Sequence, residues 1–244
     1  MERLDKFLAN QGQRSRSQAR ILIKRGRVTV NGKAQTDPEA KIDPDADRIR
    51  IDGGDVAYRK YIYLMLNKPQ GVVCSTRDGL SPTVLSLVPP QFQRKGLFPA
   101  GRLDKDTEGF VLITDDGELS HKMLSPKSHV PKLYYCELQR EPEAGYGAAF
   151  ASGMTLLDGE KCLPAQFVAG KKPKSGWVVL REGMFHQVKR MFETLGNQVV
   201  YLKRTRIGGL ELDPKLDLGE CREILHKEIS AILEDFSAEN VNFL

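Results

Sequence analysis

The sequence is poor in cysteine and histidine, and neither residue type is clustered. Four residues of each type are dispersed over 244 positions, whereas a zinc ribbon or a redox motif brings two cysteines within about two to four residues. The HExxH, GxGxxG and GxxxxGK[ST] patterns are absent as well. We therefore expect no metal site and no nucleotide cofactor, and we interpret the cysteines as packed thiols.

Long apolar segments are also missing. The longest apolar runs, such as 110–113, are only a few residues, far below the roughly 20 that a membrane span needs. The N-terminal sequence MERLDKFLAN contains no apolar signal segment. We expect a cytoplasmic globular protein without a membrane partner, and the length predicts two domains at about 150 residues per domain.

Positive charge is concentrated in the first quarter of the chain. Residues 1–60 contain 14 Lys and Arg against 9 Asp and Glu, whereas residues 61–244 contain 23 of each. Between positions 14 and 33 seven cations stand without an acidic residue, and a like-charge face of this density repels itself. A phosphate backbone is the commonest partner of such a row, because neutralised phosphates release counterions; a merely solvated face is the alternative. The candidates for this contact are Arg14, Arg16, Arg20, Lys24 and Arg27.

The first sixty residues are typical of two helices followed by a small sheet. Apolar residues at helical spacing begin at Leu4, and Ser15 or Ser17 is a candidate N-cap for a second helix that Gly26 would end. A VTV strand then enters the NG turn at 31–32. The segment RLDKFLANQGQRSRSQARILIKRGRVTVNGK resembles the S4 RNA-binding domain, which implies structured RNA as the partner.

A second domain follows a short linker at 53–60. We place the boundary so that residues 1–58 form a small α/β S4 domain and residues 59–244 form the second domain. Strands outnumber helices there without a regular βαβ rhythm, which favours a mostly antiparallel α+β domain. We predict helices at 117–124, 187–195 and 225–236, and strands at 61–66, 72–75, 110–114, 133–138, 166–168 and 177–180.

The segment AGRLDKDTEG at 100–109 is the densest polar cluster after the basic region. Its acids match the first ligands of an EF-hand calcium loop, although the twelfth position is Asp115 rather than Glu and the flanks favour strands over helices. An acidic loop without function is the second interpretation. The third is a loop that carries a catalytic carboxylate.

The order of several motifs resembles the RsuA-type pseudouridine synthase family. These motifs are YLMLNKPQGVVCST, GRLDKDTEGFVLITDDGELSHKMLSP, KLYY, EGMFHQVKRMFETLGN and RIGGLELDP. The resemblance implies an S4 domain followed by a mixed-sheet catalytic domain, no cofactor, and ribosomal RNA or a ribosomal subunit assembly intermediate as the partner. We expect a monomer. The motifs MLNKPQGVVCST and HQVKRMF are most similar in sequence to those of members that convert a specific uridine of small-subunit (16S) rRNA to pseudouridine. Action on 23S rRNA and a non-catalytic RNA-binding or assembly role remain alternatives.

The resemblance also implies roles for single residues. Asp104 corresponds to the catalytic carboxylate, and Lys189, or Arg190 beside it, corresponds to the basic residue that keeps it ionised. Tyr134 corresponds to the tyrosine that receives the flipped-out uridine, whereas Tyr135 is expected to pack in the core because neighbouring strand residues face opposite sides. The implied RNA-contacting residues of the second domain are Arg102, Asn67, Lys68 and Arg190.

Overall fold

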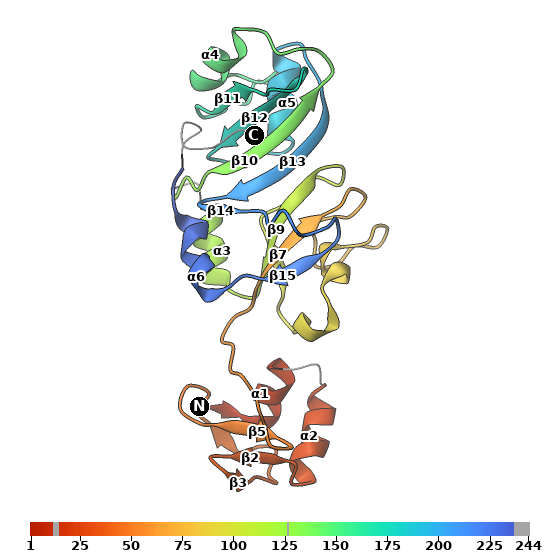
Figure 1. Cartoon of the computed structure of the whole chain (residues 1–244), viewed down its shortest axis with the longest axis vertical. Helices are drawn as coiled ribbons and strands as arrows, with labels where there is room; N and C mark the ends of the chain where they lie inside the picture. The colour runs from red at the N-terminus through yellow and green to blue at the C-terminus, as the bar shows by residue number, and fades with distance from the viewer. Residues whose placement is uncertain (12–14, 126, 237–244) are drawn as a thin grey trace. The chain divides into compact units, whose positions relative to one another are not determined.

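A computed structural model describes residues 1–11, 15–125 and 127–236 (Figure 1). The chain divides into two compact units. The first contains Met1–Ile62 with Val88–Leu97, and the second contains Tyr63–Leu87 with Phe98–Leu244. The helical content and the mixed sheet confirm the predicted α+β class, while the boundary at 58 stays a prediction.

The first unit has the two helices and small sheet that the sequence predicts. The second helix is capped by Ser15, whose hydroxyl accepts from the Gln18 amide while the Gln18 side chain accepts from the Ser15 amide. Gly26, at φ 69°, follows its C-terminus. Leu4, Phe7 and residues of both helices and the sheet form the core. The elements are α1 Leu4–Asn10, α2 Arg16–Lys24, the antiparallel pair β1 Glu2–Arg3 and β4 Lys41–Ile42, the 3-10 helix η2 Pro90–Phe92, and a sheet with the order β3 Lys33–Ala34, β2 Val28–Val30, β5 Ile49–Ile51 and β6 Gly54–Asp55.

The second unit is built on one large mixed sheet. Its strand order is β11-β12-β10-β13-β9-β7-β15, with β14 added to β13 and β8 added to β9. Within the described residues, β13 and β9 form the one parallel pair of this sheet, so the mostly antiparallel prediction is confirmed. The strands are β7 Tyr63–Lys68, β8 Phe98–Ala100, β9 Glu108–Thr114, β10 Lys132–Leu138, β11 Gln166–Ala169, β12 Ser175–Leu180, β13 Val199–Ile207, β14 Leu210–Glu211 and β15 Cys221–Glu223.

Helices cover this sheet in two groups (Figure 1). Met191 and Phe192 of α5 are fully buried, and Phe192 packs against Phe150 of α4 and Phe167 of β11. On another part of the sheet, α3 and the C-terminal helical turns enclose a core around Phe110 and Leu112. The helices are α3 Gly117–Leu124, α4 Tyr146–Ala151, α5 Gln187–Thr194 and α6 His226–Ile229, with 3-10 helices η1 Val84–Leu87 and η3 Ser230–Leu233.

The structure corrects two predicted strands. The strand placed at 61–66 runs from Tyr63 to Lys68, so it begins and ends two residues later than predicted. The strand placed at 72–75 is an isolated bridge between Val73 and Thr83. Val73 donates to the carbonyl of Pro82 and accepts from the amide of Val84, so its hydrogen bonds go to a neighbouring loop rather than to the sheet.

The helix predicted at 225–236 is also wrong in its second half. Regular α-helix ends at Ile229, a 3-10 turn continues to Leu233, and Glu234 is extended. The carbonyl of Ala231 accepts from the amide of Gly209 at 2.6 Å and from the amide of Glu234 at 3.1 Å, so it is not left to an amide four residues further on, as another α-helical turn would need. Phe236 packs beside Leu133 outside any helix.

Candidate active site

A row of facing residues crosses five strands of the large sheet. Val178 faces Tyr134, Tyr134 faces Arg204, Arg204 faces Gly109, and Gly109 faces Lys68. Residues that face each other on paired strands project to the same side of a sheet, so the Tyr134, Arg204 and Lys68 side chains share one face. Gly109 has φ +102°, and a Cβ there would lie 2.2 Å from the Arg204 carbonyl oxygen. Glycine is therefore required where β9 meets β13.

Lys68 supports the loop that carries Asp104. Its ammonium is fully buried and donates to the carbonyls of Pro69 at 3.1 Å, Lys105 at 3.4 Å and Thr107 at 2.7 Å. The amide of Thr107 in turn donates to the carbonyl of Asp104 at 3.1 Å. Burial lowers the pKa of the Lys68 ammonium. The loop lies between the strands β8 and β9. This agrees with the interpretation as a loop that carries a catalytic carboxylate, whereas an EF-hand loop would be flanked by helices.

Two basic side chains from the start of α5 approach Asp104. Lys189 Nζ lies 3.4 Å from Asp104 Oδ2 and 2.6 Å from Asp106 Oδ1, and His186 Nε2 lies 3.4 Å from Asp104 Oδ1. The Asp104 side chain is 25% exposed, so the carboxylate is reachable from solvent. Burial acts to raise the pKa of Asp106, but the hydrogen bond and the charge of Lys189, with smaller effects of the backbone and His186, together hold the pKa below its ordinary value.

Arg190 points to other partners. Its guanidinium donates to the Phe185 carbonyl at 3.0 Å and to Glu160 at 2.7 Å, and it also pairs with Asp158. Of the two candidates that the sequence left open, Lys189 is therefore the neighbour of Asp104. His186 was missed, because its approach depends on a left-handed backbone (φ 49°, ψ 31°) at the N-cap of α5, which the HQVKRM motif does not reveal.

The two tyrosines of β10 face opposite sides, as predicted. Tyr135 packs against Trp177 and Tyr201 at centroid distances of 5.1 and 6.2 Å, and its hydroxyl donates to Glu137. Tyr134 is 9% exposed and shares its face of the sheet with Arg204. Tyr134 is thus the mostly buried residue of the pair, whereas Tyr135, which we expected in the core, is partly exposed.

The remaining sequence candidates in this unit differ in accessibility. Arg102 is exposed two residues before Asp104. Asn67 is 3% exposed, and its amide donates to the carbonyl of Leu216 at 2.8 Å. With Lys68 buried as well, these two side chains offer almost no surface to RNA.

Two buried cations in β10 and β13 escaped the sequence analysis. Lys132 and Arg204 are 8% and 4% exposed, and Arg204 Nε donates to the Phe110 carbonyl at 2.8 Å. Burial, with a smaller effect of Arg204, lowers the pKa of Lys132 to about 8. The one signal in the sequence is strand alternation: Lys132 lies two residues before Tyr134, so both side chains are expected on the same face of the strand.

The basic row of α2 is partly neutralised by an acid from α1. Asp5 has a fully buried side chain that accepts from Arg3 and Arg16, and Arg20 lies 3.9 Å away. These hydrogen bonds hold the pKa of Asp5 below its ordinary value, although burial alone would raise it. The inference of an unbalanced face was therefore wrong, because the pairing acid lies outside the segment that we counted.

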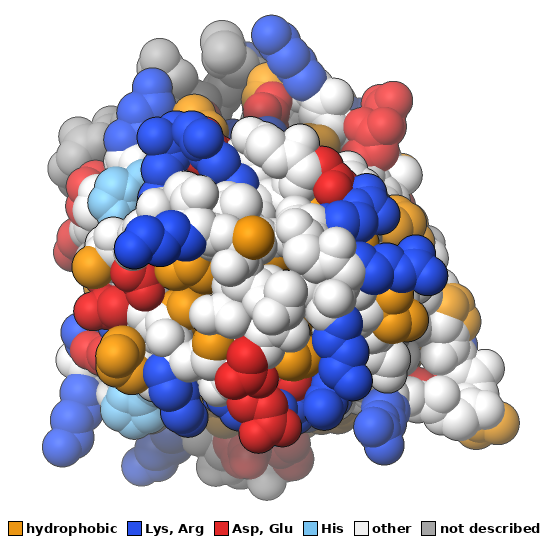
Figure 2. All heavy atoms as spheres, turned by 90° about the horizontal axis from the view of Figure 1, so that it is seen from below, with side chains coloured by type: hydrophobic (Ala, Val, Ile, Leu, Met, Phe, Trp, Pro, Cys, Tyr) orange, Lys and Arg blue, Asp and Glu red, His pale blue; other side chains and the backbone are white. Residues whose placement is uncertain are grey.

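The other basic candidates of the first unit vary in their surroundings. Arg27 pairs with Asp52, whereas Lys24 is exposed at the end of α2, and Arg14 lies outside the described residues. Figure 2 shows the molecule from below, with Lys and Arg side chains at several places and Asp and Glu side chains between them. Positive and negative side chains therefore alternate over this surface, and it is not uniformly positive.

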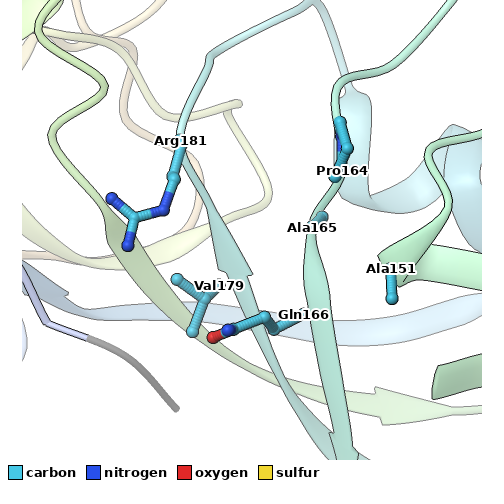
Figure 3. A pocket seen from close by; sticks show the side chains of 6 residues that line it. All are labelled: Ala151, Pro164, Ala165, Gln166, Val179 and Arg181. Atoms are coloured by element: carbon cyan, nitrogen blue, oxygen red, sulfur yellow. The ribbon is translucent and has the colours of Figure 1, made fainter. Parts of the chain in front are cut away.

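A separate hollow of about 290 Å³ lies elsewhere in the second unit (Figure 3). It shares no residue with the cluster around Asp104, and its one charged lining residue, Arg181, is paired with Asp235. The residues that line the hollow are Ala151, Pro164, Ala165, Gln166, Val179 and Arg181.

Within residues 1–11, 15–125 and 127–236, no group of three His, Cys, Asp or Glu side chains could hold a metal ion. No helix in the same ranges is long and apolar enough to cross a membrane.

Comparison with known proteins assigns both units. The family model described as RNA pseudouridylate synthase matches residues 62–194, which is more than half of the chain. The chain belongs to the RNA pseudouridylate synthase family. The S4 domain model matches residues 2–47, so the predicted order of an S4 domain followed by a synthase domain is confirmed.

Curated relatives and a solved structure agree along nearly the whole chain. The chain is 43% identical to an uncharacterized RNA pseudouridine synthase, YtzG, of Bacillus subtilis, covering 95% of this chain and 98% of that protein. It is 41% identical to ribosomal small subunit pseudouridine synthase A of Escherichia coli K12, covering 95% and 100%. A crystal structure of a pseudouridylate synthase matches with a TM-score of 0.66 and 39% identity over 95% of this chain. The protein is a pseudouridine synthase, and hence an isomerase.

Proposed function

We propose that this synthase isomerises one specific uridine of small-subunit (16S) ribosomal RNA, with Asp104 as the catalytic carboxylate. The substrate is supported by similarity to relatives named ribosomal small subunit pseudouridine synthase A. The role of Asp104 is carried by one observation: it is a partly exposed carboxylate that has both Lys189 Nζ and His186 Nε2 within 3.4 Å. The substrate is either free rRNA or an assembly intermediate.

The reaction needs one anionic oxygen and no redox chemistry. The N1–C1′ bond of uridine breaks, the base turns, and C5 bonds to C1′; the C5 hydrogen leaves as a proton and N1 takes up a proton, so that the product is an isomer of the substrate. Asp104 acts at the sugar or the base as nucleophile or general base. An ammonium 3.4 Å away stabilises negative charge on that carboxylate electrostatically, which is the role we give to Lys189.

Tyr134 and Arg102 complete the proposed site. A uridine stacked in RNA must be extruded before its C5 can react, at a cost of a few kcal/mol, and an aromatic face recovers part of that cost. We assign the face to Tyr134 and the contact with phosphate, or with the vacated stack, to the exposed Arg102. Asn67 and Lys68 are buried, so we propose structural roles for both instead of contact with RNA. Lys68 positions the Asp104 loop through the Lys105 and Thr107 carbonyls, and Asn67 holds the segment at 216–220.

The S4 domain supplies the non-specific hold on RNA. Arg16, Arg20 and Lys24 recur every fourth residue along α2 and are exposed, which suits contact with successive phosphates. Asp5 fixes the first two of these side chains by ion pairing. Such fixing lowers the conformational entropy that binding would otherwise cost.

Mapping of pseudouridine in rRNA tests this function. Cells that lack the protein should lose one pseudouridine of 16S rRNA, and the wild-type chain should restore it. The Asp104→Asn variant should fail to restore it, whereas Asp106→Asn, a neighbouring carboxylate that contacts Lys189, should restore most of it. Loss of a 23S site would refute the substrate, and restoration by Asp104→Asn would refute the catalytic residue.

A further inference from the structure

Phe185 is a large aromatic side chain that is 74% exposed. Isolated exposed apolar residues are ordinary on protein surfaces, and Val200 at 62% exposure is one in the same unit. Phe185 differs because its ring stacks on the imidazole of His186, with a centroid distance of 3.8 Å and an interplanar angle of 17°. One side of the ring is covered by His186 and most of its remaining surface is open.

The stacked pair is held in place by the backbone around it. His186 adopts left-handed φ and ψ at the N-cap of α5, and the Phe185 carbonyl accepts from Arg190 at 3.0 Å. The amide of Met184 donates to the buried side chain of Gln187 at 3.1 Å. An aromatic surface that is already ordered binds a ligand with little loss of side-chain entropy.

The same pair lies beside the proposed catalytic carboxylate. His186 Nε2 is 3.4 Å from Asp104 Oδ1, and Lys189, three residues further along the chain, contacts Asp104 and Asp106. An RNA strand that delivers a uridine to Asp104 must therefore pass close to Phe185. Extrusion of that uridine also leaves its neighbouring bases partly unstacked.

We propose that Phe185 and His186 form a stacking platform for an unpaired nucleobase of the substrate RNA, adjacent in the strand to the uridine that Asp104 acts on. The inference rests on the proposed function. Every base has a π face, so the platform tolerates any base, and specificity for the target remains with Tyr134 and the shape of the RNA. The exposed face of Phe185 receives the base, and His186 supports the ring from behind.

Substitution of Phe185 tests the platform by activity. On an unmodified 16S rRNA transcript, we expect Phe185→Leu to lower kcat/KM roughly 10-fold or more, because stacking contributes about that factor per base. Phe185→Tyr should retain activity within about twofold of wild type, since it keeps the aromatic face. Val200→Ala, the exposed apolar control, should be unchanged. Wild-type activity in Phe185→Leu, or equal losses in the Leu and Tyr variants, would overturn the proposal.

Fluorescence tests the same contact without turnover. The chain has one tryptophan, Trp177, so Phe185→Trp in the Asp104→Asn background adds a reporter on the platform. Binding of the rRNA transcript should quench this variant more than the Asp104→Asn protein alone; equal quenching while a filter assay shows binding overturns the platform. If wild type makes no pseudouridine either in the transcript or in a small-subunit assembly intermediate, the proposed function fails, and the added quenching still decides whether Phe185 stacks on a base.

Discussion

Replacement of Lys132 by methionine should stabilise the second unit at neutral pH. The Lys132 side chain is almost fully buried in β10, and burial lowers its pKa from 10.5 to about 8. At about 1.4 kcal/mol per pKa unit, the charged form is about 3 kcal/mol less stable in the fold than in the unfolded chain. Methionine fills a similar volume without a charge, so Lys132→Met should raise the free energy of unfolding at pH 7 by about that amount.

The gain should depend on pH in a defined direction. Between pH 8 and 10.5 the unfolded chain binds the Lys132 proton and the folded chain does not, so wild-type stability rises with pH in this window. The advantage of Lys132→Met is therefore full below pH 8 and disappears as pH approaches 10.5. Urea unfolding followed by Trp177, which lies on the neighbouring strand β12, reports on this unit.

A control separates burial from charge removal in general. Lys172 is exposed and paired with Glu137, so Lys172→Met should change stability by less than about 1 kcal/mol. A Lys132→Met protein that is less stable than wild type at pH 7, or whose difference from wild type does not vary between pH 7 and 10, would show that Lys132 has a favourable anionic partner or reaches water.

Two further predictions concern RNA binding and the sheet. The double variant Arg16→Gln/Arg20→Gln should weaken rRNA binding and lower the slope of log K against log salt by about 1.5 to 2, because two phosphate contacts are lost; an unchanged slope in filter binding would remove α2 from the interface. Gly109→Ala should destabilise the second unit by about 3 kcal/mol in urea unfolding, because its Cβ would lie 2.2 Å from the Arg204 carbonyl oxygen and φ is +102°. The control Gly117→Ala should have little effect, because a Cβ there meets open space. Equal stability of the two variants would contradict the close approach of β9 and β13.

Local signals in the sequence predicted much of the fold. The capping residue Ser15, the helix at 117–124 and the opposite orientations of Tyr134 and Tyr135 depend on neighbours within a few residues, and all three are confirmed. The contact of Lys189 with the Asp104 loop was suggested by family resemblance, and the structure brings the two side chains together.

Errors arose where distant segments decide the outcome. The strand β7 is buried along nearly its whole length, and the two polar residues at its end, Asn67 and Lys68, are buried by distant segments that the local sequence does not reveal. Asp5 neutralises Arg16 across 11 residues, which a count within one segment does not include. The carbonyl of Ala231 is bonded by Gly209, and no pattern of apolar residues shows that competition.

Release of the C5 hydrogen measures the central chemical step directly. Purified protein is incubated with a 16S rRNA transcript carrying tritium at C5 of uridine, and tritium is released to water as C5 bonds to C1′. We expect about one tritium per transcript from the wild-type and Asp106→Asn proteins, and none above background from Asp104→Asn. Release by Asp104→Asn at the wild-type rate would contradict the assignment of Asp104 as the catalytic carboxylate.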